Sequence, residues 1–196
     1  MRAGGRGRSR SKPSAVLLVG FMGAGKTTVG RALGEQLGWQ FEDLDERIER
    51  RAGRTVPEIF RVSGESEFRR AEQGALRAVL RELRSGAEKI VALGGGAFAQ
   101  KKNVRLIQAA GVPTVFLDAE IEELWRRCSA QACEQGVSRP LLGSKESFRE
   151  LYQARRPHYS QAPFTQQTDG KTVEQIVNEV VEILGLDPSG GGRAKG

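Results

Sequence analysis

A glycine-rich stretch at 20–28 (GFMGAGKTT) constrains the fold of this chain more than any other feature. It directly follows the apolar run 15–19 (AVLLV) and leads into 28–37, where apolar residues recur at helical spacing. A strand, a glycine turn and a helix in this order are the context in which the pattern G-x-x-x-x-G-K-[ST] forms a phosphate-binding loop. An ordinary glycine-rich turn would not need a strand before it and a helix after it. We therefore predict that this stretch binds a nucleoside triphosphate.

The residue types in this loop suit phosphate groups. Glycines let successive backbone N–H groups point inward at a phosphate, and the following helix adds its positive N-terminal end. Lys26 would reach the β- and γ-phosphates of the nucleotide, and the hydroxyl of Thr27 would be offered to Mg²⁺. The expected nucleotide-binding residues are Gly23, Ala24, Gly25, Lys26, Thr27 and Thr28.

Further strand-like and helix-like segments alternate after the loop, which predicts an α/β fold with a parallel sheet and helices on both faces. The expected strands after the first are 39–45, 89–93, 113–117 and 164–168. Ligands of such sheets bind beyond the carboxyl ends of the strands. Asp43 and Asp45 fall at one of these ends. Two apart on an extended strand, they are expected to share a face.

Composition indicates one soluble domain of the 196-residue chain, which we place at 15–185. Hydrophobic residues make up 38% and charged residues 28%, and no apolar run is long enough to cross a membrane. Five of the seven excess positive charges lie in residues 1–14, so this Gly/Arg/Ser-rich tail, like 186–196, is expected to be disordered. Weak nucleic-acid contact by the tail is the alternative reading, which we do not favour. The two cysteines have no metal-site spacing and suit a reduced, cytoplasmic chain.

Three segments between the strands leave questions open. Helices are expected at 46–52, 56–62 and 65–84, with a break at Ser63-Gly64, and Arg69 and Glu72 lie within pairing reach. Gly94–Gly96 form either a bland turn or a place where a ligand meets the backbone, and the residues alone favour neither. A helix over 121–128 is followed by a weakly periodic flap, and a helix over 145–156 should stop before Pro157.

Six motifs together resemble the bacterial shikimate kinases, from about residue 15 to residue 184. They are GFMGAGKTTVGRALG at 20–34, DLD at 43–45, ESEFRRAE at 65–72, LGGGA at 93–97, RPLL at 139–142 and R-x-P-x-Y at 155–159. The resemblance implies a P-loop kinase with three α/β/α layers and a five-stranded parallel sheet. It also implies a helical substrate-binding region near 46–75, a lid near 129–143, and a monomer. The implied reaction moves the γ-phosphoryl of ATP to the 3-hydroxyl of shikimate, on the route to chorismate and the aromatic amino acids.

The resemblance assigns roles that make chemical sense, because phosphoryl transfer needs positioning and charge neutralisation. Asp45 would hold shikimate hydroxyls and accept the proton, and Asp43 would help Thr27 to hold Mg²⁺. With Lys26, the lid arginine Arg139 would act on the transferred phosphoryl. The shikimate carboxylate would be gripped by two arginines. The expected substrate-binding residues are Asp45, Arg69, Gly94, Gly95, Gly96 and Arg155.

The chain departs from the family pattern at two points. The segment between Arg127 and Arg139 is several residues longer than in the commonest members, so the family pattern does not fix the length or the closure of the lid. For the same reason, the assignment of Arg127 and the loop around Lys171 to the adenine side is weaker than the other assignments. A second arginine, Arg156, adjoins Arg155. Two rival functions remain: a related small-molecule kinase such as a gluconate kinase, and a nucleotide-binding regulator that uses the basic tail. Neither would be expected to need all six motifs together.

Overall fold

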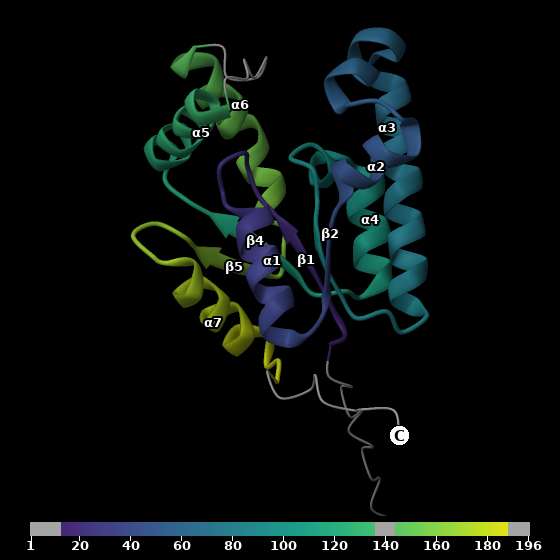
Figure 1. The fold of residues 1–196 in the computed structure, drawn as a ribbon, viewed down its shortest axis with the longest axis vertical. Coiled ribbons are helices and arrows are strands. Elements are labelled where there is room, and N and C mark those ends of the chain that lie inside the picture. The colour runs from purple at the N-terminus through teal and green to yellow at the C-terminus, as the bar shows by residue number, and fades with distance from the viewer. Residues whose placement is uncertain (1–12, 136–143, 188–196) are drawn as a thin grey trace, which may run out of the picture.

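The computed structural model of the protein describes residues 13–135 and 144–187, in which strands and helices alternate (Figure 1). The strands are β1 (Ala15–Val19), β2 (Gln40–Asp43), β3 (Lys89–Ala92), β4 (Thr114–Asp118) and β5 (Phe164–Gln167). The helices are α1 (Lys26–Leu37), α2 (Leu44–Ala52), α3 (Val56–Arg84), the 3-10 helix η1 (Ala97–Ala99), α4 (Lys101–Ala110), α5 (Ile121–Gln135), α6 (Lys145–Tyr159) and α7 (Val173–Leu184). In these ranges no helix combines the length and apolarity that a membrane crossing requires.

The strands form one parallel sheet in the order β2-β3-β1-β4-β5, which confirms the predicted sheet. All five residues of the central strand β1 are buried, as expected for a strand covered on both faces. The pairing brings the ends of three strands together, because Ala92 of β3 is in register with Leu18 of β1 and with Asp43 of β2. The segments that follow β1, β2 and β3 therefore start at one edge of the sheet.

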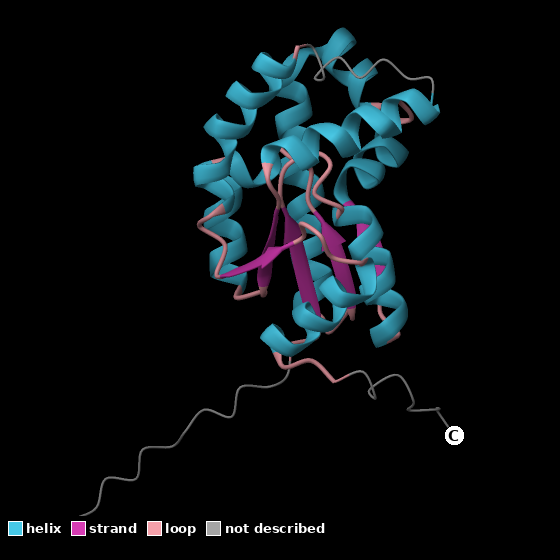
Figure 2. Ribbon diagram, turned by 90° about the vertical axis from the view of Figure 1, so that its left-hand side faces the viewer, coloured by secondary structure: helices cyan, strands magenta, loops and turns pink. Residues whose placement is uncertain are grey.

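Helices cover both faces of the sheet, which gives the predicted three layers (Figure 2). Helix α1 packs against α7, and α3 packs against α4. The break predicted at Ser63-Gly64 is present inside α3, where Gly64 has φ 77° and ψ 170°. This left-handed φ suits glycine, which has no Cβ to clash with the backbone.

The prediction that Asp43 and Asp45 share a face of one strand is wrong. Strand β2 ends at Asp43, and α2 begins at the next residue, Leu44. The Asp43 carboxylate accepts a hydrogen bond from the backbone N–H of Asp45 at 2.9 Å, so Asp43 is the N-cap of α2. The cap turns the chain before Asp45. The Asp43 side chain therefore extends from the end of β2, and the Asp45 side chain extends from the first turn of α2.

Two helices run further than predicted. Helix α5 continues past Cys128 to Gln135, so the first residues assigned to the lid at 129–143 are helical, and the rest of that lid lies outside the described residues. Helix α6 passes through Pro157 and ends at Tyr159. Because Pro157 lies in the last turn and Tyr159 is fully buried, packing outweighs the one backbone hydrogen bond that proline cannot donate.

The tails predicted at 1–14 and 186–196 fall almost entirely outside the described residues. One residue of the predicted C-terminal tail does not fit the expectation. Leu186 is buried, and its N–H donates to the carbonyl of Val181 at 2.9 Å beyond the end of α7. The packed part of the chain therefore extends at least one residue past the boundary at 185.

Two helical glycines generate a stability prediction. A Cβ on Gly34 would lie 2.8 Å from the backbone oxygen of Trp39, whereas a Cβ on Gly74 would have no atom within 4 Å. Gly34→Ala should destabilise the protein by about 1–3 kcal/mol, because a backbone carbonyl has little freedom to move. The control Gly74→Ala should stabilise it by about 0.5–1 kcal/mol through its helix propensity. Urea denaturation measures both, and equal effects would contradict the packing around Gly34.

Candidate active site

The glycine loop between β1 and α1 presents an open helix N-terminus. Gly25 caps α1 with φ 86°, a left-handed conformation that glycine adopts without a Cβ clash. Among the described residues no side chain caps this end of α1, and its first turn contains no acidic residue. Its backbone N–H groups and the helix dipole therefore favour an anion. Predicted loop residue Ala24 is buried below the loop, while the other five line a pocket.

Lys26 begins α1 and turns its side chain back over the loop. Its Nζ donates to the carbonyls of Gly20 and Phe21, at 2.9 Å each. Burial lowers the pKa of Lys26, and the nearby carboxylates of Asp45 and Asp43 oppose this effect. The ammonium group therefore has two backbone carbonyls as hydrogen-bond partners.

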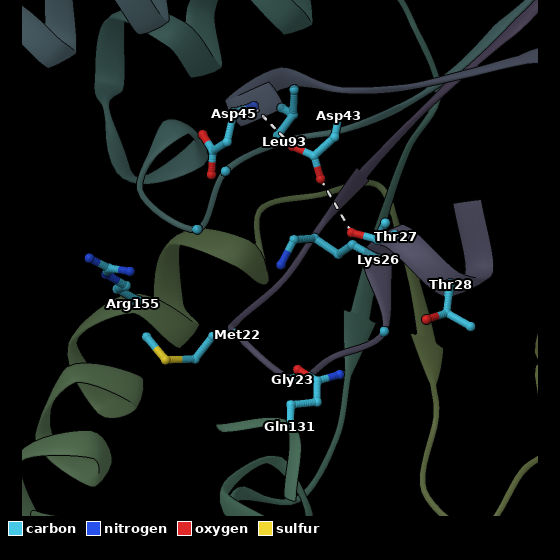
Figure 3. Close-up of a pocket in the computed structure, with 13 residues that line it drawn as sticks. Met22, Gly23, Lys26, Thr27, Thr28, Asp43, Asp45, Leu93, Gln131 and Arg155 are labelled. Atoms are coloured by element: carbon cyan, nitrogen blue, oxygen red, sulfur yellow. Dashed lines mark hydrogen bonds between the residues drawn. The ribbon is translucent and has the colours of Figure 1, made fainter. Parts of the chain in front are cut away.

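The glycine loop and residues of three other motifs share one pocket of about 310 Å³ (Figure 3). The loop contributes Gly23, Gly25, Lys26, Thr27 and Thr28. The facing wall contains Asp43, Asp45, Gly94, Gly95 and Arg155. The structure thus brings together residues from four separate sequence motifs, at the edge of the sheet where β1, β2 and β3 end.

Thr27 and Asp43 lie side by side in this pocket. The Thr27 hydroxyl donates to Asp43 Oδ2 at 3.2 Å, as the dashed line in Figure 3 shows. One hydroxyl and one carboxylate suit Mg²⁺, which keeps several waters and takes phosphate oxygens as further ligands. The described residues contain no cluster of three or more His, Cys, Asp or Glu side chains that could form an all-protein metal site. The donor set therefore fits a metal that arrives with the nucleotide.

Asp45 points into the pocket from the first turn of α2 (Figure 3). Its Oδ1 is buried, and no group in the described part of the chain hydrogen-bonds to it. Burial raises the pKa of Asp45 to about 6, and the negative charges of Asp43 and Glu72 add to the effect, while Lys26 opposes it. A carboxyl group with a pKa near neutrality and an unused acceptor is suited to proton transfer.

The three glycines Gly94–Gly96 make room for the side chains of the site. A Cβ on Gly94 would lie 2.4 Å from Asp45 Oδ1, and a Cβ on Gly96 would lie 2.5 Å from Arg69 Nη1. Gly95 faces Arg155, whose Nη1 would be 3.3 Å away. None of the three has a positive φ, so their small size matters more than their flexibility. Each of the three glycines lies against one predicted substrate-binding residue, which supports a role in the site, while contact between a ligand and this backbone stays a prediction.

Arg69 is held by two glutamates of its own helix, α3. Its Nη1 donates to both carboxylate oxygens of Glu72, at 3.1 and 3.2 Å, and its Nε and Nη2 donate to Glu65 at 3.2 and 3.1 Å. Glu72 is only 1% exposed, and burial raises its pKa although Arg69 opposes the shift. The predicted Glu72–Arg69 pair is confirmed, while the role of Glu65 was not foreseen. Arg69 lies against Gly96, and neither of these two predicted substrate-binding residues lines the pocket.

The structure separates the two adjacent arginines of α6. Arg155 lines the pocket, as predicted, whereas Arg156 points elsewhere and pairs with Asp118 at 2.7 Å. One turn beyond Arg155, the hydroxyl of Tyr159 donates to the carbonyl of Gly95. Helix α6 is therefore joined directly to the glycine segment that accommodates Arg155.

Gln131 and Met22 also line the pocket, and neither was given a role from the sequence. Gln131 reaches it because α5 continues beyond Cys128, which no clear periodicity indicated. Arg127, assigned to the adenine side, donates to the carbonyl of Gly23 at 3.4 Å and to both oxygens of Thr168 at 3.1 and 3.2 Å. The lid arginine Arg139 lies outside the described residues.

The raised pKa of Asp45 generates a prediction for metal-free and ligand-free protein. A carbon-13 NMR titration in EDTA should give Asp45 an apparent pKa of about 6. Asp43→Asn should lower this pKa, because one of the negative charges that raise it is removed, but burial should keep it above 3.8. Glu46→Gln, an exposed change on the same helix, serves as the control and should leave the pKa unchanged. An unaltered pKa in the Asp43→Asn protein would contradict this electrostatic coupling.

Comparisons with known proteins agree with this geometry. The family model described as shikimate kinase matches residues 22–185. A shikimate kinase of Cereibacter sphaeroides is 42% identical over 176 residues, which cover 88% of this chain and 83% of the relative. The structure of a shikimate kinase from Acinetobacter baumannii in complex with shikimate has a TM-score of 0.74 and 34% identity, covering 89% of this chain and 93% of that one.

The rival suggested by the sequence, a gluconate kinase, shares the fold at a greater distance. A gluconokinase from Sinorhizobium meliloti has a TM-score of 0.55 and 18% identity, covering 90% of this chain and 94% of that one. At this identity the likeness extends to the fold alone. With the family model matching more than four fifths of its length, the chain belongs to the shikimate kinase family.

Proposed function

We propose that this protein transfers the γ-phosphoryl group of ATP to the 3-hydroxyl of shikimate, which gives shikimate 3-phosphate and ADP on the route to chorismate. The observation that carries the proposal is the single pocket in which Lys26 and the open end of α1 face Asp45 and Arg155. A purely regulatory nucleotide-binding protein would have no need of this second wall. Membership of the shikimate kinase family identifies the acceptor.

The glycine loop would hold the donor. Backbone N–H groups of Gly23–Thr28 would bind the β-phosphate, and Lys26 would exchange its carbonyl partners for phosphate oxygens. Thr27 and Asp43 would hold Mg²⁺, which when bound neutralises negative charge on the phosphates. Arg139 would close over the same phosphates from the lid and help to exclude water.

The opposite wall would hold the acceptor. Arg69 and Arg155 would bind the carboxylate of shikimate, since guanidinium groups match carboxylates in bidentate geometry. The backbone of Gly94–Gly96 would lie against the sugar-like ring. Asp45 would accept a hydrogen bond from the 3-hydroxyl and take its proton as the oxygen forms a bond to the γ-phosphorus. The bond between that phosphorus and the β,γ-bridging oxygen breaks, and the electron pair leaves with ADP.

We also propose that the enzyme works as a monomer in the cytoplasm. Large exposed hydrophobic side chains in the described part of the chain are few, namely Phe60, Val62 and Ile183, so no extensive apolar surface calls for a second subunit. The use of only two cysteines without metal-site spacing supports a reducing compartment.

The activity is tested by a coupled assay of ADP release with ATP, Mg²⁺ and shikimate. Release should depend on shikimate, whereas gluconate or no acceptor should give only background. Asp45→Asn should nearly abolish turnover while ATP still binds, because the amide cannot accept the proton. In the wild-type enzyme kcat/KM for shikimate should fall as the pH is lowered through about 6, where Asp45 becomes protonated. Folded protein that releases no ADP in response to shikimate would refute the proposal, and near-normal turnover by Asp45→Asn would remove Asp45 from its role.

Binding of the shikimate carboxylate is tested with neighbouring arginines of α3. Arg69→Ala should weaken shikimate binding by about 2–5 kcal/mol, the usual cost of removing one partner of a buried charge pair. Arg70→Ala is the matched control, because its side chain is 74% exposed and pairs only with the surface residue Glu67 among the described residues. Isothermal titration calorimetry measures both affinities. Equal affinities for shikimate in the two variants would place the carboxylate elsewhere.

A further inference from the structure

Arg156 and Asp118 form an ion pair outside the pocket, one residue away from the acceptor-side Arg155. We propose that this pair is a positioning device: by fixing the rotation of α6 it aims Arg155 into the pocket. The inference rests on the proposed function only in taking Arg155 as a shikimate ligand.

Asp118 is a buried anchor at the end of β4. Its side chain is 4% exposed, and its Oδ2 accepts from Arg156 Nη2 at 2.7 Å. The Tyr152 hydroxyl, one turn earlier on α6, lies 3.3 Å from Asp118 Oδ1 and 3.2 Å from the carbonyl of Ala119. Two side chains of α6 therefore converge on one carboxylate, and the carboxylate belongs to the rigid sheet rather than to another surface helix.

Because Arg156 is anchored to Asp118, the geometry of α6 determines the direction in which Arg155 points. Successive residues of an α-helix point about 100° apart. With Arg156 held on Asp118, Arg155 must face the adjacent side of α6, which is the side toward the pocket. Tyr159, four residues after Arg155, donates to Gly95 and secures the same side. Arg156 and Tyr152 thus limit rotation in one direction, while Tyr159 sets the distance to the glycine segment.

The sheet end that carries Asp118 also touches the donor loop. A Cβ on Gly20 would lie 2.6 Å from the carbonyl oxygen of Leu117, the residue before Asp118. The carbonyl of Asp118 itself accepts from the N–H and the hydroxyl of Thr168, at 2.9 and 3.2 Å. Asp118 therefore directly follows the residue that packs against the start of the loop that would bind ATP, and through Arg156 it sets Arg155 relative to that loop.

The same helix offers a matched control. Arg149 of α6 also forms an ion pair, with Glu122 of α5 at 2.8 Å, and its side chain is 47% exposed compared with 49% for Arg156. The two pairs differ in the partner, because Glu122 is 56% exposed and Asp118 only 4%. Loss of a surface pair has little effect, whereas loss of Arg156 leaves a buried carboxylate without its cation.

The experiment compares Arg156→Gln, Asp118→Asn, the double variant and Arg149→Gln, measuring KM for shikimate, KM for ATP and the melting temperature. Arg156→Gln should raise KM for shikimate about tenfold, change KM for ATP little, and lower the melting temperature. Tenfold corresponds to about 1.4 kcal/mol of binding free energy. The double variant removes both charges, so its melting temperature should recover while KM for shikimate stays raised. Arg156→Lys, which keeps the cation, should recover part of the affinity.

Three results would overturn the positioning role. They are a KM for shikimate in Arg156→Gln no higher than in Arg149→Gln, a KM that recovers together with the melting temperature in the double variant, and equal increases in both KM values. Hydrogen exchange at residues 152–159 gives a readout without substrate, and it should quicken in Arg156→Gln but not in Arg149→Gln. If the wild type lacked shikimate-dependent turnover, the proposed function would fail, and the exchange data would still decide whether the pair orders α6.

Discussion

The hydrogen bond from the Asp45 N–H to the Asp43 carboxylate determines how the two halves of the pocket meet. It ends β2, starts α2 and sends the two carboxylates in different directions. Asp43 remains beside Thr27 at the donor end, and Asp45 reaches over Gly94 at the acceptor end. One capping interaction thus separates two chemically identical side chains, so that the proposed function can assign the metal to Asp43 and the proton to Asp45.

Most of the fold follows from the sequence because strong local patterns agree with the tertiary structure. The apolar run before the glycine loop, the alternation of strands and helices, and the break near Gly64 were all predicted and are present. The site residues could be named from their motifs, and the pocket contains most of them. These patterns can be recognised in the sequence because few other residue types could replace the glycines, the lysine and the carboxylates at the ends of the strands.

The remaining features depend on contacts that sequence spacing does not specify. The N-cap at Asp43 is decided by one hydrogen bond, and α6 continues past Pro157 because Tyr159 packs in the core. The surroundings of the three glycines could not be read from the sequence, since each glycine faces a side chain from a distant segment. Likewise the motif distinguishes Arg155 from Arg156, but the partner of Arg156, Asp118, lies 38 residues earlier in the chain and no sequence pattern points to it.

Lys26 gives the donor loop a form of selectivity. Its ammonium group donates hydrogen bonds to the carbonyls of Gly20 and Phe21. A ligand that binds to Lys26 must replace both of these hydrogen bonds, so Lys26 exchanges its carbonyl partners for atoms of the ligand. Polyphosphates supply charged oxygens that make this exchange favourable, whereas an uncharged nucleoside has no charged acceptor for the ammonium group. The carbonyl partners of Lys26 therefore favour ligands that carry a charged phosphate chain over uncharged ones.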